Sequence, residues 1–145
     1  MSGDSAARLY STEILALAVS LAGHPYREDA ALHGKARSRT CGGTLDLSFD
    51  LEDGRIAKPG LRMSACAIGQ ASAAIFLNAA IGLDTAGLEA GRRAMTDWLA
   101  GEGVRPDWPG MAALEPARDY PSRHGAILLP WNAAHDALPS PAPAR

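Results

Sequence analysis

The feature that most constrains the fold is a strict alternation of apolar and polar residues over 44–51. This period of two is typical of a strand with one buried face. The apolar positions are Leu45, Leu47, Phe49 and Leu51, and the polar positions are Thr44, Asp46, Ser48 and Asp50. Glu52-Asp53-Gly54 then predicts a hairpin turn, because glycine readily takes a positive φ. The sequence therefore predicts a return strand over 55–64, in which Pro59 requires a sheet edge or a bulge.

Helical periodicity surrounds this hairpin. Apolar residues recur every three to four positions in segments that predict helices over 9–22, 67–81, 84–100 and 122–138. Ser64 is the expected N-cap of the second helix, and Asp84 or Thr85 that of the third. Pro130 predicts a kink in the last helix or a late start to it, because proline cannot donate a backbone hydrogen bond.

The segments between these elements are less regular. The basic stretch 27–39 is predicted to be an exposed, irregular connection, and 101–121 a long loop or an insertion with short helices. The order of helix, antiparallel hairpin and further helices predicts an α+β sandwich whose sheet is covered on one face. The length of 145 residues suits one domain, predicted over 1–138. Residues 139–145 contain three prolines and are expected to be a disordered tail.

Charge and hydropathy restrict the function class. The chain has 14 basic and 16 acidic residues, a net charge of −2, which argues against a general nucleic-acid binder. No apolar run approaches the roughly 20 residues that span a bilayer, and the first residues do not resemble a secretory signal. We therefore expect a cytoplasmic protein with neither a membrane nor a nucleic acid as partner.

Two cysteines are the candidate reactive groups, and they are too few for a disulfide framework. Cys41 lies in Thr-Cys-Gly-Gly, where the glycines leave the sulfur accessible. Cys66 follows the return strand at the start of a helix, a position that favours the thiolate. The hairpin between them returns the chain to its starting edge. The pair suits half of a metal site, a redox pair or a sulfur acceptor.

The surroundings of both cysteines resemble the U-type iron–sulfur cluster assembly scaffolds, namely IscU, SufU and the N-terminal domain of NifU. The family pattern around the second cysteine is matched by Cys66, Ala67, Ile68, Ala71 and Ser72, and Cys66 follows Cys41 by 25 positions. Tyr120-Pro121-Ser122-Arg123, with Leu129 and Trp131, is similar to a SufU segment. The stretch of about 95–121 matches the insertion of SufU-type chains. The resemblance covers about 9–137 and is closest to SufU.

The resemblance implies a SufE/IscU-like sandwich with an antiparallel sheet of about three strands. It also implies a non-enzymatic scaffold or sulfur carrier, for which a sulfurtransferase role is conceivable, with a cysteine desulfurase as partner. Iron, zinc or an iron–sulfur cluster would be held by cysteine thiolates, here Cys41 and Cys66. The chain departs from the family at two ligand positions: the usual aspartate is Gly43 and the third cysteine is Ala126. His124 is the first candidate replacement ligand, and Asp46, Asp119 and His33 are further candidates.

These departures leave several hypotheses open. Zinc and iron–sulfur clusters normally take four protein ligands, so a homodimer that joins two cysteine pairs is one way to complete a site. A second hypothesis is a degenerate, metal-free scaffold that acts as a docking module for the assembly partners. A third is a thiol–disulfide switch between Cys41 and Cys66, which requires Cα atoms within about 7 Å.

Overall fold

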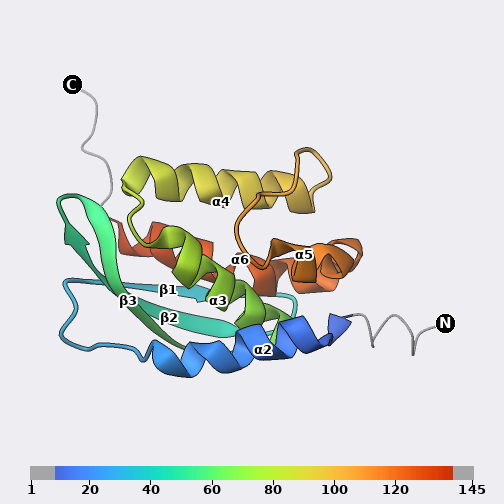
Figure 1. Cartoon of the computed structure of the whole chain (residues 1–145), viewed down its shortest axis with the longest axis horizontal. Helices are drawn as coiled ribbons and strands as arrows, with labels where there is room; N and C mark the ends of the chain where they lie inside the picture. Colours follow the sequence, from blue (N-terminus) through green and yellow to red (C-terminus); the bar gives the residue numbers. More distant parts are fainter. Residues whose placement is uncertain (1–8, 139–145) are drawn as a thin grey trace.

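The computed structural model describes residues 9–138, and in it helices cover one face of a three-stranded antiparallel sheet in the order β1-β2-β3 (Figure 1). The strands are β1 (Leu32–Arg37), β2 (Thr44–Glu52) and β3 (Arg55–Ser64). The helices are α2 (Thr12–Ser20), α3 (Ala67–Ala80), α4 (Thr85–Leu99), α5 (Met111–Leu114) and α6 (Pro121–Ala137), with short 3₁₀ helices η1 (Leu21–Gly23) and η2 (Glu115–Asp119). The predicted α+β class with a sheet of three strands is confirmed.

The predicted hairpin is confirmed in detail. Asp53 and Gly54 form its two-residue turn with φ values of 54° and 77°, the conformation that matches the twist of antiparallel strands. In β3, Lys58 and Pro59 lie opposite the single residue Phe49, which makes a bulge. The strand is also at the edge of the sheet. Both features accommodate a proline that has no hydrogen bond to donate.

The prediction of an irregular connection over 27–39 is wrong for 32–37, which form β1. The alternation is present but weak. Leu32, Gly34 and Ala36 pair with the helix-facing residues of β2. Gly34 has no side chain and Ala36 has only a methyl group, so the sequence shows little apolar pattern here. Gly34 is required by the packing, because a Cβ there would overlap the carbonyl oxygen of Ala133 in α6. Helix α6 thus lies directly against β1.

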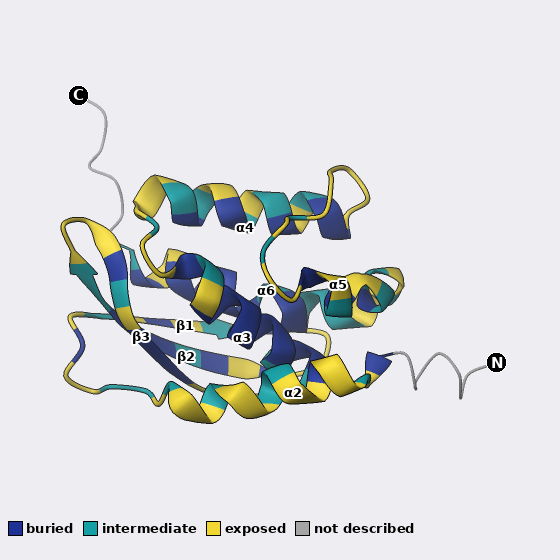
Figure 2. Cartoon of the chain, viewed as in Figure 1, coloured by how far each residue is buried: buried dark blue, intermediate teal, exposed yellow. Residues whose placement is uncertain are grey.

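The core lies between the sheet and helices α3 and α6. Leu45, Leu47 and Phe49 of β2 are at most 1% exposed, and α3 is buried along most of its length (Figure 2). Helix α4 packs on the far side of α6, so it forms an outer layer (Figure 1). There, Trp131 of α6 makes an edge-to-face contact with Phe76 and is stacked by Trp108 at 4.6 Å between ring centroids.

The four predicted helices are present, with changes at their ends. Cys66 rather than Ser64 is the N-cap of α3, so that prediction is wrong, whereas Asp84 caps α4 by accepting a hydrogen bond from Gly87 N at 2.8 Å. The first helix is shorter than predicted and continues as η1. Helix α6 has no late start: it begins at Pro121 and runs through Pro130.

The segment 101–121 contains α5 and η2, so the alternative with short helices is confirmed. The predicted tail, 139–145, lies outside the described residues. Within the described part of the chain, no helix has both the length and the apolar character needed to cross a membrane.

Candidate functional site

Three segments meet at one end of the sheet: the β1–β2 loop over 38–43, the start of α3 and the first turns of α6. Thr44 pairs with Ser64, so the residues just before β2 and just after β3 are neighbours. A Cβ placed on Gly43 would lie 3.2 Å from the Cβ of Ala65, and one placed on Gly69 would lie 3.2 Å from the Cβ of Ala126. The loop that carries Cys41 and the helix start that carries Cys66 are therefore adjacent.

Backbone hydrogen bonds close the loop that carries Cys41. Ser38 N donates to Gly43 O at 2.8 Å, and Gly42 N donates to Ser38 O at 2.9 Å. Gly42 has φ 71°, which favours glycine at this turn. The loop leaves Cys41 exposed to solvent, whereas Ser38 and Gly43 at its two ends are buried.

The Cys41 sulfur has polar partners that favour its thiolate. Its Sγ lies 3.3 Å from Ser38 Oγ, and this hydrogen bond is the main reason that the pKa of the Cys41 thiol is lowered. Burial is the second-largest effect and opposes this shift, while the backbone of Gly43 and the positive charge of Arg123 in α6 lower the pKa by smaller amounts. Since the thiolate is the reactive form of cysteine, an exposed Cys41 has the environment of a nucleophile.

Cys66 has a different environment. It is the N-cap of α3 with extended backbone, and its side chain makes no capping hydrogen bond. It is half-buried and packs partly against the core. The neighbouring Gln70 amide donates instead to Ala65 O at 2.9 Å, which ties the helix start to the preceding strand. Both cysteine thiols are free, so the structure contains no Cys41–Cys66 disulfide.

His124 is held through one of its two ring nitrogens. Its Nε2 lies 2.7 Å from Arg118 O, to which it donates, and this bond ties the first turns of α6 to η2. The described residues contain no group of three or more His, Cys, Asp or Glu side chains that could hold a metal ion. Gly43 and the fully buried Ala126 supply no donor atom. The donors of one chain therefore do not fit a closed four-ligand zinc or cluster site.

Ser38 and Thr40 are the site residues that the sequence analysis missed. Only their hydroxyl groups, three positions and one position before Cys41, pointed to them. The basic residues nearest to Cys41 in the sequence, Lys35, Arg37 and Arg39, are exposed. The cation that acts on Cys41 is Arg123, which is remote in sequence and arrives on α6.

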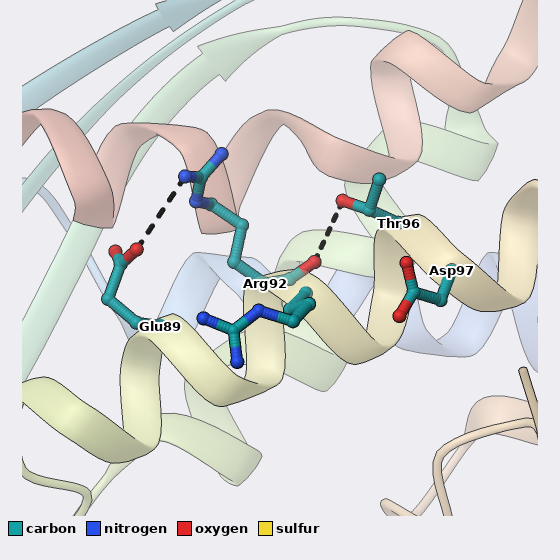
Figure 3. Close-up of a pocket in the computed structure, with 5 residues that line it drawn as sticks. Glu89, Arg92, Thr96 and Asp97 are labelled. Atoms are coloured by element: carbon teal, nitrogen blue, oxygen red, sulfur yellow. Dashed lines mark hydrogen bonds and ion pairs between the residues drawn. The ribbon is translucent and has the colours of Figure 1, made fainter.

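A hollow of about 200 Å³ lies on α4, lined by Glu89, Arg92, Arg93, Thr96 and Asp97 (Figure 3). Among its lining residues, Arg92 Nη2 lies 3.6 Å from Glu89 Oε2, and the Thr96 hydroxyl donates to Arg92 O at 2.8 Å. It contains no cysteine, and its helix belongs to the outer layer, so it is not the candidate site.

Comparison with solved structures identifies the fold. A nitrogen-fixing NifU-like protein (N-terminal) from Brucella abortus superposes with a TM-score of 0.78 at 29% identity, covering 90% of this chain and 92% of that chain. The resemblance to the U-type scaffold family is confirmed. A protein assigned to iron–sulfur cluster assembly as a scaffold of the SUF system, from thermophilic Fervidobacterium islandicum AW-1, gives the same TM-score at 22% identity and covers 89% of this chain and 96% of that chain.

No protein-family model matches the chain, and no curated protein does. The likeness to these two structures shows a U-type fold. Because function resides in the site rather than the fold, what this chain carries must be argued from its own residues.

Proposed function

We propose that this chain is a cytoplasmic, scaffold-type sulfur acceptor of iron–sulfur cluster assembly, which takes sulfane sulfur from a cysteine desulfurase onto Cys41. It is not itself an enzyme in this proposal. The observation that carries it is the exposed Cys41 thiol, whose pKa is lowered by the Ser38 hydrogen bond and by Arg123, on a U-type fold. Neither a nucleic acid nor a membrane is a proposed partner.

The transfer step balances without an added oxidant or reductant. The Cys41 thiolate attacks the outer sulfur of the persulfide on the desulfurase. A new sulfur–sulfur bond forms on Cys41 while the bond in the donor breaks, and the desulfurase cysteine leaves as its thiolate. The proton of the donor persulfide stays with the transferred sulfur. Arg123 favours the attacking anion because of its charge. Cys66 is the second thiol of this site.

Iron, zinc or a cluster is cargo in this proposal, and one chain lacks the donors to enclose it. Cys41 and Cys66 supply two thiolates, and His124, whose Nε2 donates to Arg118 O, keeps Nδ1 as its one remaining nitrogen for a metal. A homodimer that joins two cysteine pairs would supply four.

One alternative is supported by a specific observation. Positions 43 and 126 are glycine and alanine, so the two positions where the family resemblance implies further ligands are without donors. This favours a metal-free docking module that retains the fold and binds the assembly partners without chemistry of its own. The thiol–disulfide switch between Cys41 and Cys66 stays a prediction, which reversible oxidation of the purified chain would test.

Transfer of labelled sulfur separates these functions. The chain is incubated with a cysteine desulfurase and L-cysteine labelled in its sulfur, and protein-bound sulfane sulfur is located by mass spectrometry. We expect one added sulfur atom on Cys41, absent from Cys41→Ser and retained in Cys66→Ser. Bound sulfur that survives Cys41→Ser, or none on the parent chain, would contradict the proposal.

Metal and acid-labile sulfide are measured on the same preparations after anaerobic purification. Iron with sulfide that is lost in Cys41→Ser/Cys66→Ser would show that a second chain or His124 completes a cluster site. Desulfurase binding that persists in this double variant, without sulfur transfer or metal in the parent chain, would favour the docking module.

A further inference from the structure

The Cys41 loop is joined to α6 by a line of hydroxyl groups. Cys41 Sγ lies 3.3 Å from Ser38 Oγ, which lies 3.2 Å from Thr40 Oγ1. Thr40 in turn donates to the backbone oxygen of Ser122, in the first turn of α6, at 3.1 Å. Ser38 is only 3% exposed, although it is polar and lies in a surface loop. The burial of this polar side chain therefore has a structural cause.

That cause is the missing side chain at Gly125. A Cβ at this position would overlap Ser38 Oγ and would approach Thr40 Oγ1 to 3.2 Å. Gly125 is within helix α6, where alanine is normally preferred over glycine by about 1 kcal/mol. The helix thus gives up intrinsic stability at the one residue whose lack of a side chain admits the Ser38 hydroxyl.

The proton positions follow from the partners. The single hydroxyl proton of Thr40 is committed to Ser122 O, so the proton of Ser38 has two available acceptors, Thr40 Oγ1 and the Cys41 sulfur. When Cys41 is a neutral thiol, its S–H donates to Ser38 Oγ, and Ser38 donates to Thr40. When Cys41 is a thiolate, the Ser38 hydroxyl turns and donates to the sulfur, which is the stronger, charge-assisted bond.

We propose that Ser38, admitted by Gly125, is the positioning residue for Cys41: its hydroxyl holds the sulfur in place and donates a hydrogen bond to it when it reacts. This inference rests on the proposed function of Cys41 as sulfur acceptor. The other groups near the sulfur do not replace Ser38: Arg123 acts by charge, Arg39 in the loop is exposed, and the first turn of α3 carries no acidic residue. Ser38 and Gly125 therefore act as one unit.

Alkylation of Cys41 tests this without any partner protein. In a Cys66→Ser background Cys41 is the sole cysteine, and its reaction with iodoacetamide is followed from pH 6 to 10. Ser38→Ala removes the donor, so we expect the rate profile to move to higher pH and the rate at pH 7 to fall severalfold. Gly125→Ala displaces the hydroxyl and is expected to have the same effect. Ser20→Ala, at an exposed serine in α2, is the matched control and leaves the profile unchanged.

The double variant Ser38→Ala/Gly125→Ala tests the coupling. Once the Ser38 hydroxyl is gone, the atom nearest to a Cβ at position 125 is Thr40 Oγ1 at 3.2 Å. We expect the double variant to alkylate like Ser38→Ala alone and to recover most of the thermal stability that Gly125→Ala loses. Two effects that simply add in rate and in stability would overturn the proposal.

Thr40→Val tests the direction in which the pH profile of Cys41 alkylation moves. It removes the competing acceptor of the Ser38 proton, which leaves the Cys41 sulfur as the remaining acceptor. We therefore expect the alkylation profile to stay in place or move to lower pH, opposite to Ser38→Ala. A profile that is unchanged in Ser38→Ala, or that rises equally in Thr40→Val, would overturn the proposal. Because no desulfurase is present, these results are independent of whether sulfur transfer to Cys41 occurs.

Discussion

Glycines lie both at the α4–α6 interface and at the end of the sheet that carries the cysteines, and they have different structural roles in these two regions. Between α4 and α6, Gly91 makes room for Trp131, whose ring atoms would overlap a Cβ at that position. At the cysteine end, a Cβ on Gly43 would meet neighbouring atoms at 3.2–3.4 Å, a tight but not overlapping approach. One glycine is required by packing, whereas the other stands where the family resemblance implies a ligand.

The difference shows which of the two glycines is enforced by packing. Trp131 is buried and is held in place by Phe76 and Trp108, so the residue of α4 that faces its ring must be small. Nothing comparable fills the space beside Gly43, whose nearest neighbours are the side chain of Ala65, Ser64 O and the end of Leu129. The glycine at position 43 is therefore a change in chemistry that packing around its Cβ position does not enforce.

The largest expected effect is a gain of metal binding when the missing donors are restored. Gly43→Asp with Ala126→Cys adds a carboxylate and a thiolate to Cys41 and Cys66, which completes a four-donor set. We expect about one zinc ion per chain after purification in zinc-containing buffer, measured by atomic absorption, and none in the parent chain. The control is Gly43→Asn with Ala126→Ser, which matches the sizes with weaker donors. A folded, zinc-free Asp/Cys variant would mean that these segments are not spaced for a shared ion.

The next effect in size is a loss of stability at the packed region. Replacing glycine by alanine inside a helix normally stabilises by up to about 1 kcal/mol. At Gly91 we expect the opposite sign, a loss of about 2 kcal/mol in the free energy of unfolding, because the added methyl group overlaps the Trp131 ring. Urea denaturation followed by tryptophan fluorescence measures this.

Gly87→Ala, in the same helix, is the control for Gly91→Ala. Its Cβ would have contacts of 3.2–3.3 Å, to the Leu83 side chain and to Asp84 Oδ1. We expect its stability to change by less than about 1 kcal/mol. If Gly91→Ala behaved like Gly87→Ala, the distinction drawn between the two regions would be lost.

The sequence predicted the elements with strong periodicity and missed what depends on tertiary contacts. The alternation over 44–51 and the turn at Gly54 are local signals, and both predictions are confirmed. Strand β1 was missed because Gly34 is small for a reason visible only in α6. The U-type resemblance came from residues around Cys66, which are close together in sequence.

The candidate site was predicted less completely than the fold. Both cysteine segments lie at one end of the sheet, as the hairpin suggested. The partners of Cys41 were not foreseen, because Arg123 acts from a helix more than eighty positions away and Ser38 owes its burial to Gly125. Contacts between residues so far apart produce no recognisable spacing pattern in the sequence.

The smallest expected effect is at Gly43. Gly43→Ala adds one methyl group where Ala65, Ser64 O and Leu129 must each move by a few tenths of an ångström. That cost is offset because alanine restricts the unfolded chain, an effect of roughly 0.4–1 kcal/mol. We expect the free energy of unfolding to change by less than about 1 kcal/mol and the Cys41 alkylation rate to stay within about twofold of the parent, since Ser38 and Arg123 remain in place. Urea denaturation and iodoacetamide kinetics measure both quantities. A loss as large as that at Gly91 would show that Gly43, too, is held by packing, and the cysteine end would then be closed to a side chain at this position for the same reason as the α4–α6 interface.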